Sequence, residues 1–301
     1  YIYIYIVHNM KKIVVCLTGG VNRSIRYTWQ SIQDNMIEPL QKDYQVHIAV
    51  FNNNVEDCLV DGVPINNRDM LLIHYNYLYE YKQTEIDEEI KQIDGYEKDY
   101  HPYFFGKMKQ NGIRHMYIES KVAKFLTKNK DVYDYVIVSN PDYFYLNKLN
   151  VDCLQNIKED TIGTCHHWEY GDMCTDGFYI GFPNSIINIL NRLSIYSHLT
   201  TNYKKPMLNY ERILNESILY NNLHRLKLDF YFLKIRANLE LENGALEKSK
   251  SIYYKMFDDF LNTNKDKEIY TYLQKHVRKK IYPSKKPSLH MNQLLNRIIY
   301  M

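Results

Sequence analysis

The sequence predicts an α/β protein in which a mainly parallel sheet is flanked by helices. Short runs of β-branched and aromatic residues at 12–17, 45–51 and 135–138 are typical of buried strands. Segments with apolar residues at spacings of three and four, such as 26–40 and 107–128, lie between these runs and predict amphipathic helices. Strands that alternate with helices are the pattern of a parallel sheet.

Length and composition set limits on the class of protein. The 301 residues suit one large domain or a domain with an appendage. A net charge of +3 without a long basic block gives no reason to expect nucleic acid. No apolar run approaches the roughly 18 residues that span a bilayer, so no membrane span is expected. Five irregularly spaced cysteines indicate reduced thiols, and we therefore expect a cytoplasmic protein.

The chain opens with YIYIYI, ahead of a clean first strand that follows Met10. The opening lacks the charged start and small-residue cleavage site of a signal peptide. We interpret residues 1–9 as a non-native upstream extension and Met10 as the natural start.

A glycine loop follows the first predicted strand, residues 12–17, and precedes the helix at 26–40. Gly19 and Gly20 let the backbone approach a phosphate, and the helix N-terminus favours an anion. Arg23 could add a bidentate contact to a diphosphate. The loop is neither a P-loop nor a G-x-G-x-x-G motif, so an ordinary glycine turn with a solvated arginine is the alternative.

The helix at 107–128 carries a wide apolar stripe and is expected to be largely buried. Arg114, Tyr117 and Lys121 lie at helical spacing and could face a nucleotide; the alternative is the polar edge of a packed helix. Further strands are expected at 70–74, 161–165, 174–182 and 226–235, and further helices at 85–93, 185–193 and 208–223.

The central strand at 135–138 breaks at Ser139-Asn140-Pro141-Asp142. Proline cannot donate to a sheet ladder and disfavours helix in the preceding residue, so the strand is expected to end here. Ligands of open α/β sheets bind at this carboxyl end. Asn140 and Asp142 offer oxygen atoms that Mg²⁺ or Mn²⁺ prefers. The alternative is an ordinary Asn-Pro-Asp turn.

Asp176 precedes the apolar segment that ends at Phe182. A carboxylate in this place could act as general base toward an acceptor hydroxyl. The alternative is a turn residue that binds backbone N–H groups.

Cys165, His166, His167 and Cys174 carry side chains of the types that bind zinc. Their spacing matches no regular zinc motif, and adjacent residues of a strand point to opposite faces. The better functional interpretation is a loop that faces an acceptor, with Trp168 stacking on a sugar.

Taken together, the order and spacing of five motifs resemble those of GT-A-type glycosyltransferases, in particular the group found in giant viruses and bacterial surface-polysaccharide clusters. The motifs are Gly20–Arg23, Tyr133–Asp142, Asp176–Gly181, Glu211–Leu214 and Arg236–Asn238. The resemblance covers about residues 10–238 and implies a GT-A-like, Rossmann-like mixed sheet. We accordingly expect a nucleotide-sugar-binding catalytic domain over 10–240 and a helical extension over 241–301 that packs on it.

By this resemblance, the chain moves a sugar from a nucleotide-sugar donor to a glycan or glycoprotein acceptor, which Asp176 would meet. The first alternative is a degenerate relative that binds a glycan or a nucleotide without transfer. The second is another nucleotide-dependent enzyme on a doubly wound sheet, against which the absence of a P-loop or Rossmann fingerprint counts.

The same resemblance implies a divalent cation, Mn²⁺ or Mg²⁺, that bridges the donor diphosphate. Asp142 stands where the family places its D-x-D metal motif, and Asn140 replaces the first carboxylate, which weakens the charge of the site. A late histidine often completes the metal site in the family. His290 is the candidate, with His224 and His276 as alternatives.

Overall fold

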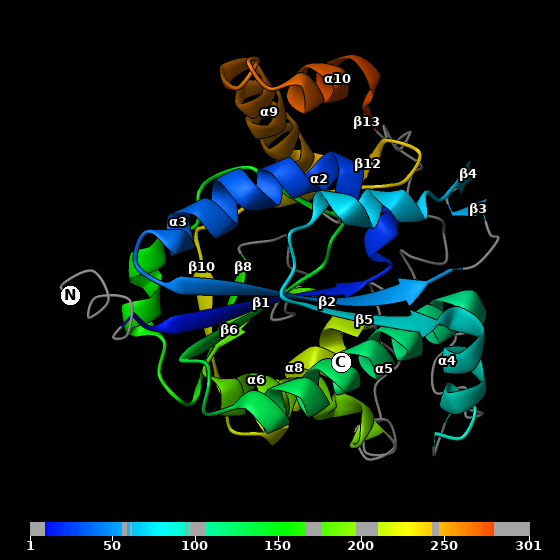
Figure 1. Ribbon diagram of the computed structural model, residues 1–301, viewed down its shortest axis with the longest axis vertical. Helices are drawn as coiled ribbons and strands as arrows, with labels where there is room; N and C mark the ends of the chain where they lie inside the picture. Colours follow the sequence, from blue (N-terminus) through cyan, green and yellow to red (C-terminus); the bar gives the residue numbers. More distant parts are fainter. Residues whose placement is uncertain are drawn as a thin grey trace, which may run out of the picture.

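The computed structural model describes residues 10–55, 59–60, 62–93, 96, 106–165, 176–196, 210–242 and 247–279 (Figure 1). Its main sheet has seven strands in the order β10-β8-β9-β6-β1-β2-β5. The strands are β1 (Lys12–Gly19), β2 (Gln45–Asn54), β5 (Tyr77–Lys82), β6 (Tyr135–Ser139), β8 (Thr161–Cys165), β9 (Phe178–Gly181) and β10 (His224–Leu228). β9 runs antiparallel to β6 and β8, whereas the other neighbours are parallel. The prediction of a mixed, mainly parallel sheet is confirmed.

Helices cover both faces of the main sheet, because the central strands are apolar on both sides. One face packs against α4 (Gln83–Ile90), α5 (Gly106–Asn129), α6 (Pro183–Leu190) and α8 (Tyr210–Tyr220). The other packs against α2 (Ile25–Ile32), a π-helical turn η2 (Gln33–Ile37) and α3 (Glu38–Gln41). The two helical layers lie below and above the sheet in Figure 1.

A second sheet, in the order β13-β12-β11-β7, lies beside the main one. Its strands are β7 (Tyr143–Tyr145), β11 (Phe232–Ile235), β12 (Glu240–Glu242) and β13 (Arg278–Lys279). α9 (Glu247–Thr263) and α10 (Glu268–His276) pack on it through an apolar cluster around Phe144. Asp34 of η2 also accepts a hydrogen bond from the Tyr270 hydroxyl at 2.7 Å and pairs with Lys267 at 2.5 Å. The terminal helices are thereby fixed to the helical segment that begins with α2.

One predicted strand is wrong, and another is divided into two strands. The segment predicted as a strand at 70–74 is mostly the end of a 3₁₀ helix, η3 (Asn67–Leu72), which begins where the Asn66 side chain accepts from the backbone N–H of Arg68 at 3.1 Å. The edge strand is instead β5. The single strand predicted at 226–235 is two strands, β10 and β11, which belong to different sheets. A tight turn, in which Phe230 N donates to Leu228 O at 2.7 Å, separates them.

Several predictions lie outside the described residues, namely those for residues 1–9, His166, His167, Trp168, Cys174 and His290. Across the part of the chain that is described, no helix combines the length and apolar character needed to cross a bilayer.

Candidate functional site

The candidate site lies at the point of the main sheet where the chain stops adding strands on one side of β1 and begins to add them on the other. From β1 the chain adds β2 and β5 on one side, and then returns to the other side of β1 with β6. β1 and β6 are parallel neighbours, with Leu17 opposite Ser139, so both strands end at the same edge. Such a switch point opens a crevice at the carboxyl ends of the strands. The glycine loop and the Asn140–Asp142 segment therefore meet at this edge.

The glycine loop continues from β1 into a short 3₁₀ helix, η1 (Val21–Arg23), where Arg23 is half-buried. Gly19 has φ +112°, a conformation that favours glycine. The Val21 N–H donates to Asn52 Oδ1 at 3.0 Å, which anchors the loop to the end of β2. On α2, Thr28 Oγ1 donates to the Pro141 carbonyl at 2.5 Å. This bond ties the first turn of α2 to the backbone beside Asp142.

Asp142 connects the two sheets. Its carbonyl accepts from the N–H of Ile235 at 2.9 Å, immediately beyond the β7–β11 ladder. Its carboxylate is 13% exposed and lies 3.5 Å from a guanidinium nitrogen of Arg236. Asp142 is thus directed toward a cation at the strand edge and not into open solvent.

Asp176 forms a similar arrangement with Lys234. Its carboxylate lies 4.0 Å from Lys234 Nζ, with side chains 20% and 23% exposed. Its backbone carbonyl accepts a hydrogen bond from the Tyr143 hydroxyl. Burial lowers the pKa of Lys234, but Asp176 and Asp142 raise it, and the net pKa lies above its usual value. Lys234 therefore carries its charge at neutral pH. We call Asp142, Asp176, Lys234 and Arg236 the charged cluster.

Glu211, at the start of α8, belongs to the same electrostatic environment. Burial, followed by repulsion from Asp176, raises the pKa of Glu211 to about 7. Its carboxyl group is thus poised to exchange a proton near neutral pH. The sequence motifs include Glu211 without giving it a role, and they give none to Lys234. The available signals are a carboxylate beside the apolar positions of α8 and a lysine between Leu233 and Ile235.

Asn140 packs against the turn that carries Asp176. Its N–H donates to the Gly177 carbonyl at 2.7 Å. Gly177 has φ +100°, and a Cβ at this position would collide with Asn140 Nδ2. Asn140 Oδ1 is buried without a hydrogen-bond partner among the described residues. Asn140 and Gly177 thus fit each other closely, and this fit sets the position of Asp176.

A buried polar chain supports the same turn from inside the protein. The Gly177 N–H donates to Tyr179 Oη at 3.0 Å, and two guanidinium nitrogens of Arg192 donate to that oxygen at 3.3 and 3.4 Å. Arg192, in η5 (Asn191–Leu193), also pairs with Glu119 of α5 at 2.6 Å, and both side chains are 0% exposed. The backbone next to Asp176 is therefore held by a fixed internal network.

Arg114 does not join the site. Its guanidinium binds Asp87 of α4 through two contacts of 2.6 and 2.5 Å. A bidentate pair of this kind fixes the plane of the guanidinium. In the structure Arg114 thus links α5 to α4, and its role in nucleotide binding stays a prediction.

The described residues do not fit a divalent cation. No three His, Cys, Asp or Glu side chains among them come together as a ligand set. Asp142 already faces Arg236, and Asp176 already faces Lys234. These two cations would repel a divalent metal ion placed beside the carboxylates. His224 lies beside Asp160 at the amino end of β10, and His276 stacks on Tyr272 of α10. With His290 outside the described residues, its role as a metal ligand stays a prediction.

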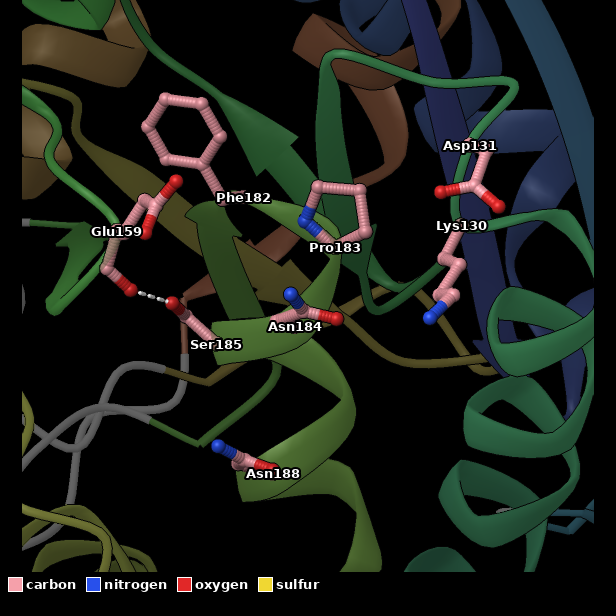
Figure 2. Close-up of a pocket in the computed structure, with 8 residues that line it drawn as sticks. All are labelled: Lys130, Asp131, Glu159, Phe182, Pro183, Asn184, Ser185 and Asn188. Carbon is pink, nitrogen blue, oxygen red and sulfur yellow. Dashed lines mark hydrogen bonds between the residues drawn. The ribbon is translucent and has the colours of Figure 1, made fainter.

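Two hollows lie elsewhere. One hollow has a volume of about 200 Å³, and its lining includes Lys130 of the α5–β6 connection and Ser185 at the start of α6 (Figure 2). The Ser185 hydroxyl donates a hydrogen bond to the Glu159 carbonyl. This hollow is at the amino end of β6, opposite the charged cluster. The other, of about 690 Å³, lies between α2 and α10, beside Tyr27 and Tyr272. Neither contains a member of the charged cluster, so topology and charge define the candidate site.

Comparison with known proteins adds no assignment: no protein-family model matches the chain, and a search of curated proteins finds no significant match.

Proposed function

We propose that the chain is a GT-A-like glycosyltransferase that moves a sugar from a nucleotide-sugar donor to a glycan or glycoprotein acceptor. The observation that carries this proposal is the position of the charged cluster at the switch point between β1 and β6, next to the glycine loop. Donor phosphates need cations and backbone N–H groups, and the transfer needs a carboxylate beside them. This edge of the sheet offers all three.

In the proposed reaction, the bond between the anomeric carbon and the diphosphate oxygen breaks, and the acceptor oxygen forms the new bond. The nucleoside diphosphate leaves with the electron pair, and the acceptor hydroxyl gives its proton to a base. Asp176 is the first candidate for this base. Glu211 is the second, because its pKa of about 7 suits proton transfer at neutral pH. Arg23 and the N-terminus of α2 would contact the donor phosphates.

The test is donor hydrolysis and transfer, measured across a panel of nucleotide sugars with a panel of glycan acceptors. We expect one donor to be consumed, and Asp176→Asn to lower the rate about 10²–10⁴-fold, as loss of a general base does. Asp152→Asn, at an exposed position in η4 (Val151–Asn156), is the matched control and should keep the full rate. If no donor is consumed and no nucleotide binds, the proposal is overturned.

Two features also favour a second function, in which the chain binds a nucleotide or a glycan without transferring a sugar. They are Asn140 and the ion pairs that already engage Asp142 and Asp176. The same assays separate the two functions. Nucleotide binding without consumption of any donor supports the binding protein, whereas turnover excludes it.

A further inference from the structure

We propose that Lys234 and Arg236 neutralise the donor diphosphate in this chain, so that nucleotide binding does not require a divalent cation. The inference rests on the proposed function, since it concerns how the same site would hold its donor. It departs from the metal that the family resemblance implies.

The two cations come from β11 and the residue that follows it. β11 pairs antiparallel with β7, with Lys234 opposite Tyr143. Lys234 lies in β11 and Arg236 directly follows this strand. Their contacts with Asp176 and Asp142 place both side chains at the same edge. Lys234 Nζ also lies 5.3 Å from the centroid of the Tyr143 ring, which helps to orient the ammonium group. The backbone thus presents two positive charges where Asp142 and Asp176 lie.

The contacts within the charged cluster are longer than the closest contacts of the tightest ion pairs among the described residues. Arg236–Asp142 and Lys234–Asp176 measure 3.5 and 4.0 Å. By comparison, the closest contacts of Arg114–Asp87 and Arg192–Glu119 measure 2.5 and 2.6 Å. The carboxylate contacts of Lys234 and Arg236 are thus longer than those of the two comparison pairs. Phosphate oxygens, which attract guanidinium and ammonium groups strongly, can therefore compete for these two side chains.

The charges of the cluster are the third observation. Lys234 and Arg236 together carry the double positive charge that Mg²⁺ or Mn²⁺ would bring to a diphosphate, and Asp142 and Asp176 balance that charge until a diphosphate takes their place. A divalent ion placed between Asp142 and Asp176 would be repelled by both Lys234 and Arg236.

The experiment measures the binding of UDP, GDP, ADP and CDP to the full chain by calorimetry, in EDTA and separately in Mn²⁺. We expect one nucleotide to bind in EDTA with a Kd within about threefold of its value in Mn²⁺. Lys234→Gln and Arg236→Gln should each weaken that binding by about 10-fold or more, as loss of a charged hydrogen bond does. Lys234→Arg should retain it. Lys148→Gln, at an exposed position, is the matched control and should leave the Kd unchanged.

Thermal unfolding of each variant without nucleotide shows whether it is folded, and Lys234→Arg keeps the test valid if Lys234→Gln is unstable. Binding that requires Mn²⁺ and is lost in Asp142→Asn would overturn this inference while supporting the proposed function. Equal affinity in the wild type and both Gln variants would also overturn it. If none of the four nucleotides binds with or without Mn²⁺, the proposed function fails as well.

Discussion

The Glu119–Arg192 pair and the charged cluster use the same chemical groups in two different surroundings. Glu119 and Arg192 are fully buried at 2.6 Å, and Arg192 supports Tyr179 behind the Asp176 turn. The pairs of the charged cluster are longer and 13–24% exposed. A buried pair cannot be exchanged for a ligand without a large desolvation penalty, whereas a partly exposed pair can. This difference suits the Glu119–Arg192 pair to structural support, and the charged cluster to the ligand contact that we propose.

The largest expected effect comes from breaking the buried pair. Arg192→Met removes the guanidinium from the buried Glu119 carboxylate and leaves it with His115, at 3.3 Å, beside it; breaking a buried pair typically costs about 3–5 kcal/mol. Urea unfolding measures the loss. The double variant Glu119→Gln/Arg192→Met removes both charges and should be more stable than Arg192→Met alone. A loss below about 1 kcal/mol for Arg192→Met would show that the pair is not a structural support.

The next effect tests the turn that joins the two regions. Gly177→Ala forces a side chain into φ +100° and against Asn140 Nδ2, so we expect a loss of about 1–3 kcal/mol in urea unfolding. Gly20→Ala is the matched control. Its φ is −74° and its nearest neighbours would be 3.8 Å away, so its stability should stay within about 0.5 kcal/mol of wild type. Equal losses in both variants would contradict the role of this turn.

The pH dependence of stability provides a third test, through Glu211. The pKa of its carboxyl is about 7 in the folded protein and about 4.5 when unfolded. Because the folded state binds the proton more tightly, the stabilisation is complete below pH 4.5 and is lost as the pH rises to about 7. Glu211→Gln should remove this pH-dependent fall in the free energy of unfolding, which is on the order of 1 kcal/mol after screening by solvent.

Unfolding free energies between pH 4 and 8 measure the effect of Glu211. Asp176→Asn should reduce the fall without abolishing it, because burial remains the larger cause of the raised pKa. The same slope in wild type and Glu211→Gln would show that another group is responsible.

The smallest expected effect on stability belongs to the charged cluster itself. Arg236→Gln removes a partly exposed ion pair, and such pairs contribute about 0–1 kcal/mol. Urea unfolding should therefore distinguish Arg236→Gln only slightly from wild type. A loss comparable to that of Arg192→Met would mean that the two regions share one structural role.

Local patterns of the sequence predict most of the main sheet. β1, β2, β6 and β8 lie at the predicted positions, because each is an apolar run that local pattern alone identifies. β5 was not predicted, because its side chains alternate between tyrosines and other residues, most of them polar. The helix predicted at 26–40 is also correct, except that a π-helical turn interrupts it.

The charged cluster depends on pairing between distant segments, which one sequence does not reveal. Asp142 and Asp176 were predicted because each adjoins a recognisable strand. Their cationic partners come from β11 and the residue that follows it, and only the pairing of β11 with β7 brings them near. Arg114 shows the converse, since its spacing on a helix did not reveal that Asp87 would bind it.

The place of β7 at the end of the second sheet has a consequence for synthesis of the chain. Among the described residues β7 pairs with β11 alone in this sheet, and β11 emerges from the ribosome long after β6 and Asp142. Contacts between segments so far apart require closure of a long loop and form slowly. Until β11 arrives, Asp142 and Asp176 lack its cations, and β7 has an open hydrogen-bonding edge. A nascent or truncated chain that ends before Phe232 would therefore lack the charge balance of the site, even with β1, β2, β5 and β6 in place.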